Sequence, residues 1–190
     1  MEAILEHIKK FVTLKQEDEP AILDFFQLEK YAKKENLMEA GSVCKSLFFV
    51  LKGCLRLYYI SEKGVEQTVQ FAMEDWWLSD YYAFERHERS DFYIQAIEET
   101  EVLRIDLAQH EQLLGEFPVL ERYFRILYQK IQAANQRKGL YQSDFSREEF
   151  YAHFHRSFPD FSRRIPQYML ASYLQMTPEY LSEIKRKKRS

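Results

Sequence analysis

The spacing of apolar side chains near the N-terminus predicts helical structure. Apolar residues recur three to four positions apart in two groups, and an acidic stretch that ends at Pro20 separates the groups. Each group can bury one face and leave the other polar. We therefore expect two short helices between residues 3 and 28, carried by Ile4, Ile8, Phe11, Val12, Ile22, Phe25 and Phe26.

The chain from residue 29 to about residue 106 has the pattern of a β domain. It contains short runs rich in aromatic and β-branched residues, namely SLFFVLKG, CLRLYYIS, VEQTVQFA, DFYIQAIEE and TEVLRID. Lys52-Gly53 and Glu62-Lys63-Gly64 provide turn signals between the runs. Short strands joined by tight turns predict an antiparallel sandwich or barrel, most economically a jelly roll.

A long helical segment follows Asp106. Its apolar positions alternate at spacings of three and four, which is the pattern of a coiled-coil seam. The seam comprises Phe117, Leu120, Phe124, Leu127, Ile131 and Ala134, with Lys138 next in the series. A strict seam favours contact with the same helix of a second copy, so we interpret residues 116–141 as a parallel dimerisation helix. Packing of the seam against the chain's own barrel is the alternative.

Composition and length are those of a globular protein with a substantial core, because 46% of the 190 residues are hydrophobic. No apolar run approaches the roughly 20 residues of a membrane span, and the N-terminus lacks the features of a secretory signal. We expect a cytoplasmic protein with no membrane partner. Cys44 and Cys54 lie in strand-like contexts, which predicts buried thiols, and two cysteines cannot supply a four-cysteine cluster.

The charges are distributed unevenly along the chain. Residues 1–155 carry 19 Lys and Arg against 27 Asp and Glu, whereas residues 156–190 carry 8 against 3. A basic C-terminal region within an acidic protein favours contact with phosphate groups. A charged tail that only improves solubility is the alternative.

The C-terminal segment LASYLQMTPEYLSEIKRKKRS, residues 170–190, matches the packing demands of a helix-turn-helix. Ala171 is the small residue at the crossing of the two helices. Gln175 occupies the turn position that usually carries Gly, and a positive φ there would cost about 1 kcal/mol. The remaining positions required to be apolar are all apolar, namely Leu170, Leu174, Met176, Leu181 and Ile184.

The second helix of this motif has a clear start. Thr177 is the expected N-cap and Pro178 the first helical residue. Side chains able to meet base edges and phosphates are Thr177, Glu179, Tyr180, Glu183, Arg186 and Lys187. A plain amphipathic hairpin is the alternative. Because the sequence stops soon after this helix, we expect any wing strand to come from residues before Leu170.

The order of these segments resembles the cyclic-AMP receptor protein/fumarate-nitrate regulator (Crp/Fnr) family of transcription factors. SLFFVLKGCLRLYYISEKGVEQTVQFA and FYIQAIEETEVLRID are similar to its sensor-barrel strands, and RIPQYMLASYLQMTPEYLSEIKRK is similar to its DNA-binding helices. The resemblance implies an α+β protein, with a cyclic-nucleotide-binding-like jelly roll in residues 1–115, a dimerisation helix in residues 116–141 and a winged-helix-like helix-turn-helix domain in residues 142–190.

The same resemblance implies a homodimeric transcription regulator and not an enzyme, with double-stranded DNA, a second copy and RNA polymerase as partners. The family's two recognition arginines fall on Pro178 and Glu183, while its central glutamate is kept as Glu179. We therefore do not expect the family's usual half-site sequence.

The effector region departs from the family pattern. A cyclic nucleotide requires backbone N–H groups at a helix start, a Glu for the ribose and an Arg for the phosphate. DWWLSDYYAF lacks the family's Gly and Glu, and the Arg position falls on Ser90, with Arg89 one residue away. We expect no ordinary response to cyclic AMP and no cofactor; an altered ligand and no ligand remain open. The pocket candidates are Trp76, Trp77, Tyr81, Arg89 and Ser90. In the alternative, the aromatic side chains of Trp76, Trp77, Tyr81 and Tyr82 simply fill the pocket.

The histidines do not suggest a metal site. His153 and His155 lie two positions apart on a predicted helix and point about 200° apart. His7, His87 and His110 are isolated in the sequence. Two other classes remain as alternatives: a cupin-like metalloenzyme and a ligand-free interaction module with a degenerate barrel.

Overall fold

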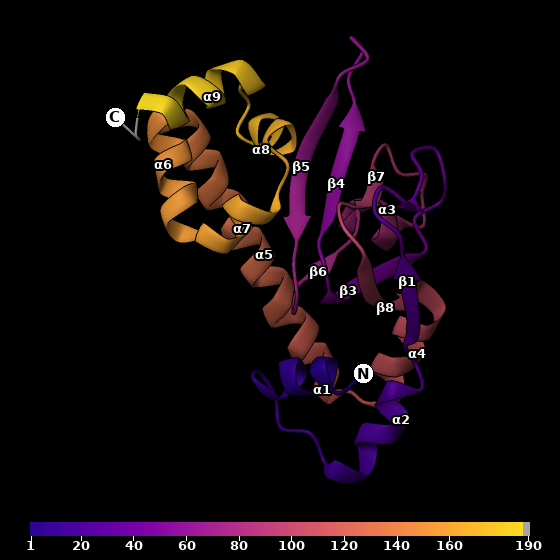
Figure 1. Ribbon diagram of the computed structural model, residues 1–190. Coiled ribbons are helices and arrows are strands. Elements are labelled where there is room, and N and C mark those ends of the chain that lie inside the picture. The colour runs from indigo at the N-terminus through magenta and orange to yellow at the C-terminus, as the bar shows by residue number, and fades with distance from the viewer. Residues whose placement is uncertain (188–190) are drawn as a thin grey trace. The chain divides into compact units, whose positions relative to one another are not determined.

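The structure is a computed structural model that describes residues 1–187 (Figure 1). The chain forms two compact units. The first contains Met1–Tyr59 and Val69–Gln129, and the second contains Ile60–Thr68 and the chain from Lys130 onward. Lys188 and Arg189, the last cations of the basic segment, lie outside the described residues.

The first unit is a jelly roll of two four-stranded sheets, which confirms the fold class expected from the sequence. One sheet has the strand order β1-β8-β3-β6 and the other has the order β2-β7-β4-β5. Strand β8 pairs antiparallel with both β1 and β3. The strands are β1 (Gln27–Tyr31), β2 (Asn36–Met38), β3 (Ser46–Lys52), β4 (Leu55–Ile60), β5 (Glu66–Ala72), β6 (Trp77–Leu78), β7 (Tyr93–Ala96) and β8 (Thr100–Asp106).

The first unit also contains helices, which come before, between and after its strands in the sequence. The helices expected near the N-terminus are present, with a short 3-10 turn, η1, between them. The set comprises α1 (Glu2–Lys9), η1 (Gln16–Asp18), α2 (Glu19–Leu23), α3 (Tyr81–Arg86), α4 (Leu107–Glu116) and the beginning of α5 (Val119–Asp144). Helix α4 starts with a capping box, in which Asp106 and Gln109 satisfy each other's backbone N–H groups.

The turn between β3 and β4 depends on glycine. Gly53 has φ +98°, and a Cβ atom built there would lie 2.5 Å from Thr100 Oγ1 and 2.6 Å from the Glu99 carbonyl oxygen. No L side chain fits this conformation and this space without moving the neighbouring backbone. The close approach holds the β3–β4 turn against the start of β8.

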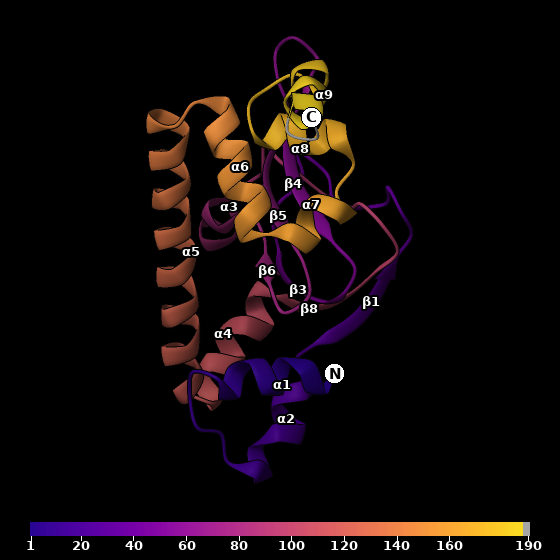
Figure 2. The same cartoon turned by 60° about the vertical axis from the view of Figure 1, so that its left-hand side comes forward.

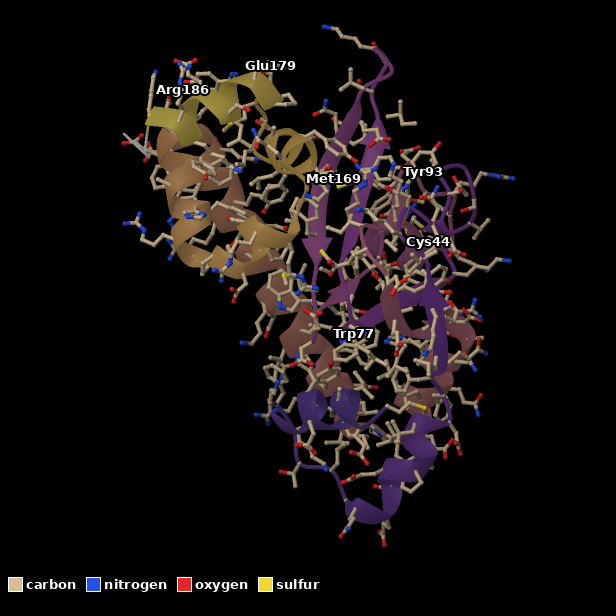
Figure 3. All side chains as sticks on the ribbon, in the orientation of Figure 1. Cys44, Trp77, Tyr93, Met169, Glu179 and Arg186 are labelled. Atoms are coloured by element: carbon tan, nitrogen blue, oxygen red, sulfur yellow. The ribbon has the colours of Figure 1, made fainter. Side chains whose placement is uncertain are left out.

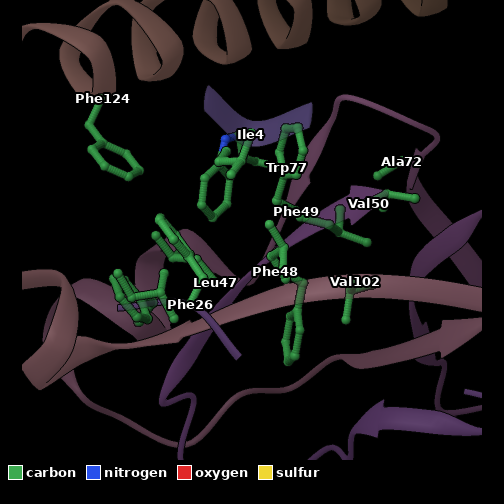
Figure 4. Close-up of a cluster of buried hydrophobic side chains, with 14 of the residues drawn as sticks. Ile4, Phe26, Leu47, Phe48, Phe49, Val50, Ala72, Trp77, Val102 and Phe124 are labelled. Carbon is green, nitrogen blue, oxygen red and sulfur yellow. The ribbon is translucent and has the colours of Figure 1, made fainter. Parts of the chain in front are cut away.

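The core of the first unit joins both ends of its sequence. Ile4 of α1, Phe49 of β3, Trp77 of β6 and Phe124 of α5 belong to one buried cluster (Figure 4). The ring centroids of Trp77 lie 5.4 Å from Phe49 and 5.5 Å from Phe124. Both cysteines are free and buried, as expected from their strand-like contexts.

One buried hydroxyl links three elements of this core. Trp77 Nε1 donates to Tyr123 Oη at 2.7 Å, and Tyr123 Oη lies 2.8 Å from His7 Nδ1. The Tyr123 hydroxyl accepts from Trp77 and forms a second hydrogen bond with His7 Nδ1, whose direction depends on the His7 tautomer. Tyr123 therefore connects α1, β6 and α5 through one oxygen atom.

The first half of the predicted dimer seam packs inside its own protomer. Leu120 and Phe124 are buried in the barrel core, and Phe117 and Leu127 pack against it. The interpretation of Leu120 and Phe124 as dimer contacts is therefore wrong, and the alternative of packing on the chain's own barrel holds for them. Phe117 and Leu127 are half-buried, and their dimer assignment stays a prediction. Further along α5, Ile131 is half-buried and Ala134 is exposed.

The second unit is mainly helical, and Figure 2 shows α5 as one unbroken helix that leads into it. The helices that follow are α6 (Arg147–Ser157), α7 (Pro159–Arg164), α8 (Gln167–Tyr173) and α9 (Pro178–Lys187). Between residues 145 and 187 the structure contains no strand, so the wing of the expected winged-helix domain is not found there.

The unit also includes the turn between β4 and β5. Within it, Ser172 Oγ donates to the Glu66 carbonyl at 3.0 Å and accepts from the Thr68 N–H at 2.9 Å.

Candidate nucleic-acid interface and sensor site

Helices α8 and α9 form a compact helix-turn-helix. All six residues that the sequence assigned to its packing are buried, and Ala171 and Leu181 are fully inaccessible. The small Ala171 side chain lets the two helices approach each other closely at their crossing. The buried set is Leu170, Ala171, Leu174, Met176, Leu181 and Ile184.

The turn between the helices has the left-handed residue that the pattern demands. Gln175 has φ +57°. The backbone N–H of Met176 then donates to the Ala171 carbonyl at 3.0 Å, which closes the end of α8. Thr177 Oγ1 accepts from the Tyr180 N–H at 3.2 Å and caps the start of α9.

The predicted DNA contacts on α9 fall into two groups. Thr177, Glu179 and Arg186 are exposed, and Figure 3 shows Glu179 and Arg186 on the outward side of the helix. Glu183 and Lys187 form an ion pair at 2.9 Å across one helical turn. The hydrogen bond between them lowers the pKa of Glu183 and raises that of Lys187.

Tyr180 is only half-buried, but it points toward α6. Its hydroxyl donates to a carboxylate oxygen of Glu148, and this bond lowers the pKa of Glu148. The outward orientation expected for Tyr180 therefore does not hold in this structure, because its polar group is used inside the unit.

Two residues of this surface were missed by the sequence interpretation. Ser182 is exposed on α9, and its hydroxyl accepts a hydrogen bond from Gln167 Nε2, at the start of α8, and donates to the Pro178 carbonyl at 2.9 Å. Helical spacing could have found Ser182, because it lies three positions after Glu179 and four before Arg186. Gln167 carried no such signal.

The five pocket candidates lie in different surroundings. Trp77 is 3% exposed and belongs to the core, whereas its neighbour Trp76 is 41% exposed. Tyr81 stacks edge-on against Tyr128 of α5, with ring centroids 5.6 Å apart. Arg89 Nη1 donates to the Gly41 carbonyl at 2.5 Å, on the surface.

Tyr82, named with them in the sequence, is 66% exposed. The side chains of Trp76 and Arg89 also lie on the surface, and their assignment to an effector pocket stays a prediction.

Ser90, the remaining candidate, belongs to a buried polar cluster at the start of α3. Its hydroxyl donates to Asp80 Oδ2 at 2.7 Å and accepts from the Phe92 N–H at 3.0 Å. Asp80 is the N-cap of α3, and its Oδ1 accepts from the Ala83 N–H at 3.2 Å. Both side chains are buried.

The backbone around Asp80 is fixed by its neighbours. Cys44 Sγ lies 3.6 Å from the Asp80 carbonyl and 3.3 Å from Ser79 Oγ. Ser79 Oγ in turn donates to the Ser46 carbonyl at 2.8 Å. Burial raises the pKa of the Cys44 thiol, which favours its protonated form.

The histidines lie in separate structural roles. His87 ends α3 in the left-handed conformation, His153 packs on Tyr141, and His155 stacks on Tyr151. His110 is buried, and burial lowers its pKa to about 4. Across residues 1–187, no group of three or more His, Cys, Asp and Glu side chains is arranged to hold a metal ion.

Comparison with known proteins agrees with this geometry. Residues 28–117 match the family model described as "Cyclic nucleotide-binding domain". The cAMP-activated global transcriptional regulator CRP of Salmonella typhimurium is 21% identical over 118 residues, which are 62% of this chain and 56% of that protein. The chain thus matches little more than half the length of this curated relative.

Solved structures extend the similarity to the helices. FixK2 from Bradyrhizobium japonicum superposes with a TM-score of 0.71 at 16% identity, covering 85% of this chain and 83% of that one. A CooA variant from Carboxydothermus hydrogenoformans gives a TM-score of 0.68 at 18% identity, covering 89% and 78%.

The fold is that of a cyclic-nucleotide-binding-type barrel followed by a long helix and a helix-turn-helix. Residues 28–117 match the cyclic nucleotide-binding domain model, and the chain is similar in sequence and fold to regulators of the Crp/Fnr type. In the described part of the chain, no helix is both long enough and apolar enough to cross a bilayer.

Proposed function

We propose that the protein is a homodimeric transcription regulator that binds double-stranded DNA through α8 and α9. The observation that carries the proposal is the helix-turn-helix geometry itself. Its apolar set is buried, its turn is closed by a left-handed residue, and α9 presents an exposed polar face. A helix of this kind fits the major groove of B-DNA.

The exposed face of α9 combines hydrogen-bonding and cationic groups. Glu179 can accept from a cytosine N4 amine, and Arg186 can bond a guanine edge or a phosphate. Lys187 adds a second cation, which its ion pair with Glu183 holds near the helix end. Ser182 lies between these residues on the same face and can bond to a base edge or a phosphate.

We also propose that a second stripe of α5 makes the dimer contact. Val119, Ile126, Ala133 and Leu140 are spaced by seven residues, so they return to nearly the same side of the helix. Val119 is 40% exposed and Leu140 is 51% exposed, which leaves apolar surface available to a partner.

The middle of α5 supports the same proposal. Residues 132–137 are exposed on all sides. An isolated helical segment without packing is only marginally stable in water, so a second copy of α5 would add the contacts that this stretch lacks. Two parallel α5 helices would place two helix-turn-helix units at DNA half-sites about 34 Å apart.

DNA binding is tested by fluorescence anisotropy with duplexes selected from a random pool. We expect binding that weakens steeply as salt rises, because phosphate contacts release counterions. Arg186→Ala should weaken binding and reduce the slope of log K against log salt by about 0.9. Arg86→Ala on α3 is the matched control and should leave both unchanged. Equal effects of the two substitutions, or no binding even at low salt, would refute the proposal.

The dimer contact is tested by analytical ultracentrifugation. Leu140→Glu should shift the protein to monomer, because two like charges would face each other across the two-fold axis. Val65 in the β4–β5 turn is also 51% exposed, and Val65→Glu should leave the dimer intact. A Leu140→Glu protein that stays dimeric would contradict the assignment of this stripe.

A further inference from the structure

The residues at the start of α3 do not fit a cyclic nucleotide. The phosphate of such a ligand needs free backbone N–H groups at a helix start together with a cation. Here the Ala83 N–H is bonded to Asp80 Oδ1, and the position expected for the cation holds Ser90. The neighbouring cation, Arg89, is bonded to the Gly41 carbonyl at the surface instead.

We propose that the Asp80 carboxylate replaces the phosphate, so that the barrel contains its own anion and excludes cyclic nucleotides. One carboxylate oxygen accepts a hydrogen bond from the Ala83 N–H at the helix start, and the other accepts one from the Ser90 hydroxyl. These are the two positions through which the phosphate would be held. A negatively charged ligand would have to displace this carboxylate or remain beside it, and both are unfavourable in a buried site.

The surrounding contacts keep the carboxylate in place. Ser90 is tied on both sides by backbone bonds, since its N–H donates to the Ser42 carbonyl at 2.9 Å and its carbonyl accepts from the Gly41 N–H at 2.7 Å. Val43 and Arg89 form an antiparallel bridge between the same two segments. Residues 89–90 are thereby paired with residues 41–43, and this pairing leaves the Arg89 side chain on the surface and not in the barrel.

An aromatic pair lies on the other side of Asp80. The Tyr81 ring lies against Tyr128, and its hydroxyl is buried with no hydrogen-bond partner among the described residues. Burial raises the pKa of Tyr81. An aromatic side chain thus lies where the first turn of α3 meets α5. This proposal concerns the barrel alone and does not depend on DNA binding by α9.

The first test is thermal unfolding of the full chain with cyclic AMP, cyclic GMP or cyclic di-GMP. A site with a Kd of about 10 µM would raise the Tm by about 5–10 °C at roughly 1 mM ligand. We expect no saturable rise with any of the three. A saturable rise with one of them would overturn the proposal.

The second test restores the missing features. Asp80→Ser keeps an N-cap residue but removes the charge and frees space, and Ser90→Arg adds the cation. The double variant should gain a saturable rise in Tm with cyclic AMP. Ser90→Arg combined with Asp91→Ser is the matched control, because Asp91 is an exposed carboxylate next to the site. Equal responses of the two double variants would overturn the proposal.

A second variant covers the case in which the double variant does not fold. Asp80→Ser alone should be stabilised by inorganic phosphate more than the wild-type protein is, with chloride at equal ionic strength as the reference. If a folded Asp80→Ser protein responds to phosphate no more than the wild type does, the carboxylate is not what excludes the anion, and the proposal is wrong.

Discussion

The hydroxyl of Tyr123 offers a direct test of how α5 is attached to the barrel. Tyr123→Phe removes only one oxygen atom, but Trp77 Nε1–H then loses its acceptor at 2.7 Å and His7 Nδ1 loses its hydrogen-bond partner at 2.8 Å. A buried donor left without a partner costs about 1–3 kcal/mol. With a smaller contribution from His7, we expect the free energy of unfolding to fall by about 2–4 kcal/mol.

Urea denaturation followed by tryptophan fluorescence and circular dichroism measures this loss. Tyr128→Phe is the matched control on the same helix, because the Tyr128 ring packs on Tyr81 while its hydroxyl bonds to no residue that the structure describes. The control should change stability by less than about 0.5 kcal/mol. If the two substitutions have equal effects, the hydroxyl of Tyr123 does not connect α1, β6 and α5 as described.

Three further predictions concern the backbone and one buried side chain. Gly53→Ala should lower the free energy of unfolding by at least about 2 kcal/mol, measured by urea denaturation, because its Cβ would collide with Thr100 and Glu99; an unchanged midpoint would show that the turn can move. Gln175→Gly should raise the Tm and stabilise the second unit by about 0.5–1 kcal/mol, since it relieves a positive φ, and a lower Tm would contradict this. His110 has a pKa of about 4 in the folded protein against 6.5 when exposed, so the unfolded state binds the proton first as pH falls. Stability should therefore drop by up to about 3 kcal/mol between pH 6.5 and pH 4, and His110→Phe should flatten this part of the pH profile measured by urea denaturation.

Local packing rules made the helix-turn-helix readable from the sequence. Its requirements are fixed offsets from Ala171 within a few turns, so Leu174, Leu181 and Ile184 could be assigned without knowing any other contact. The strain expected at Gln175 followed from the same local geometry and is present as a positive φ.

The sequence did not show which side chains face the core when the contact involves residues far apart in the chain. Helix α5 carries two apolar stripes, and its period alone does not say which one faces the barrel; the stripe with Leu120 and Phe124 does, because it completes the aromatic core around Trp77. Trp76 and Trp77 are adjacent, but only Trp77 belongs to strand β6 and is buried, so a shift of one position exchanges core for surface. Arg89 and Ser90 also differ by one position, and Arg89 is exposed whereas Ser90 is buried.

The hydrogen bonds of Ser172 have a consequence for solubility. Strand β5 lies at the edge of its sheet, where unpaired N–H and C=O groups can recruit a strand from another molecule. The single Ser172 hydroxyl satisfies the Glu66 carbonyl and the Thr68 N–H, as a neighbouring strand would. One side chain of α8 thus occupies two backbone groups at the start of β5 that could otherwise pair with a strand of another molecule.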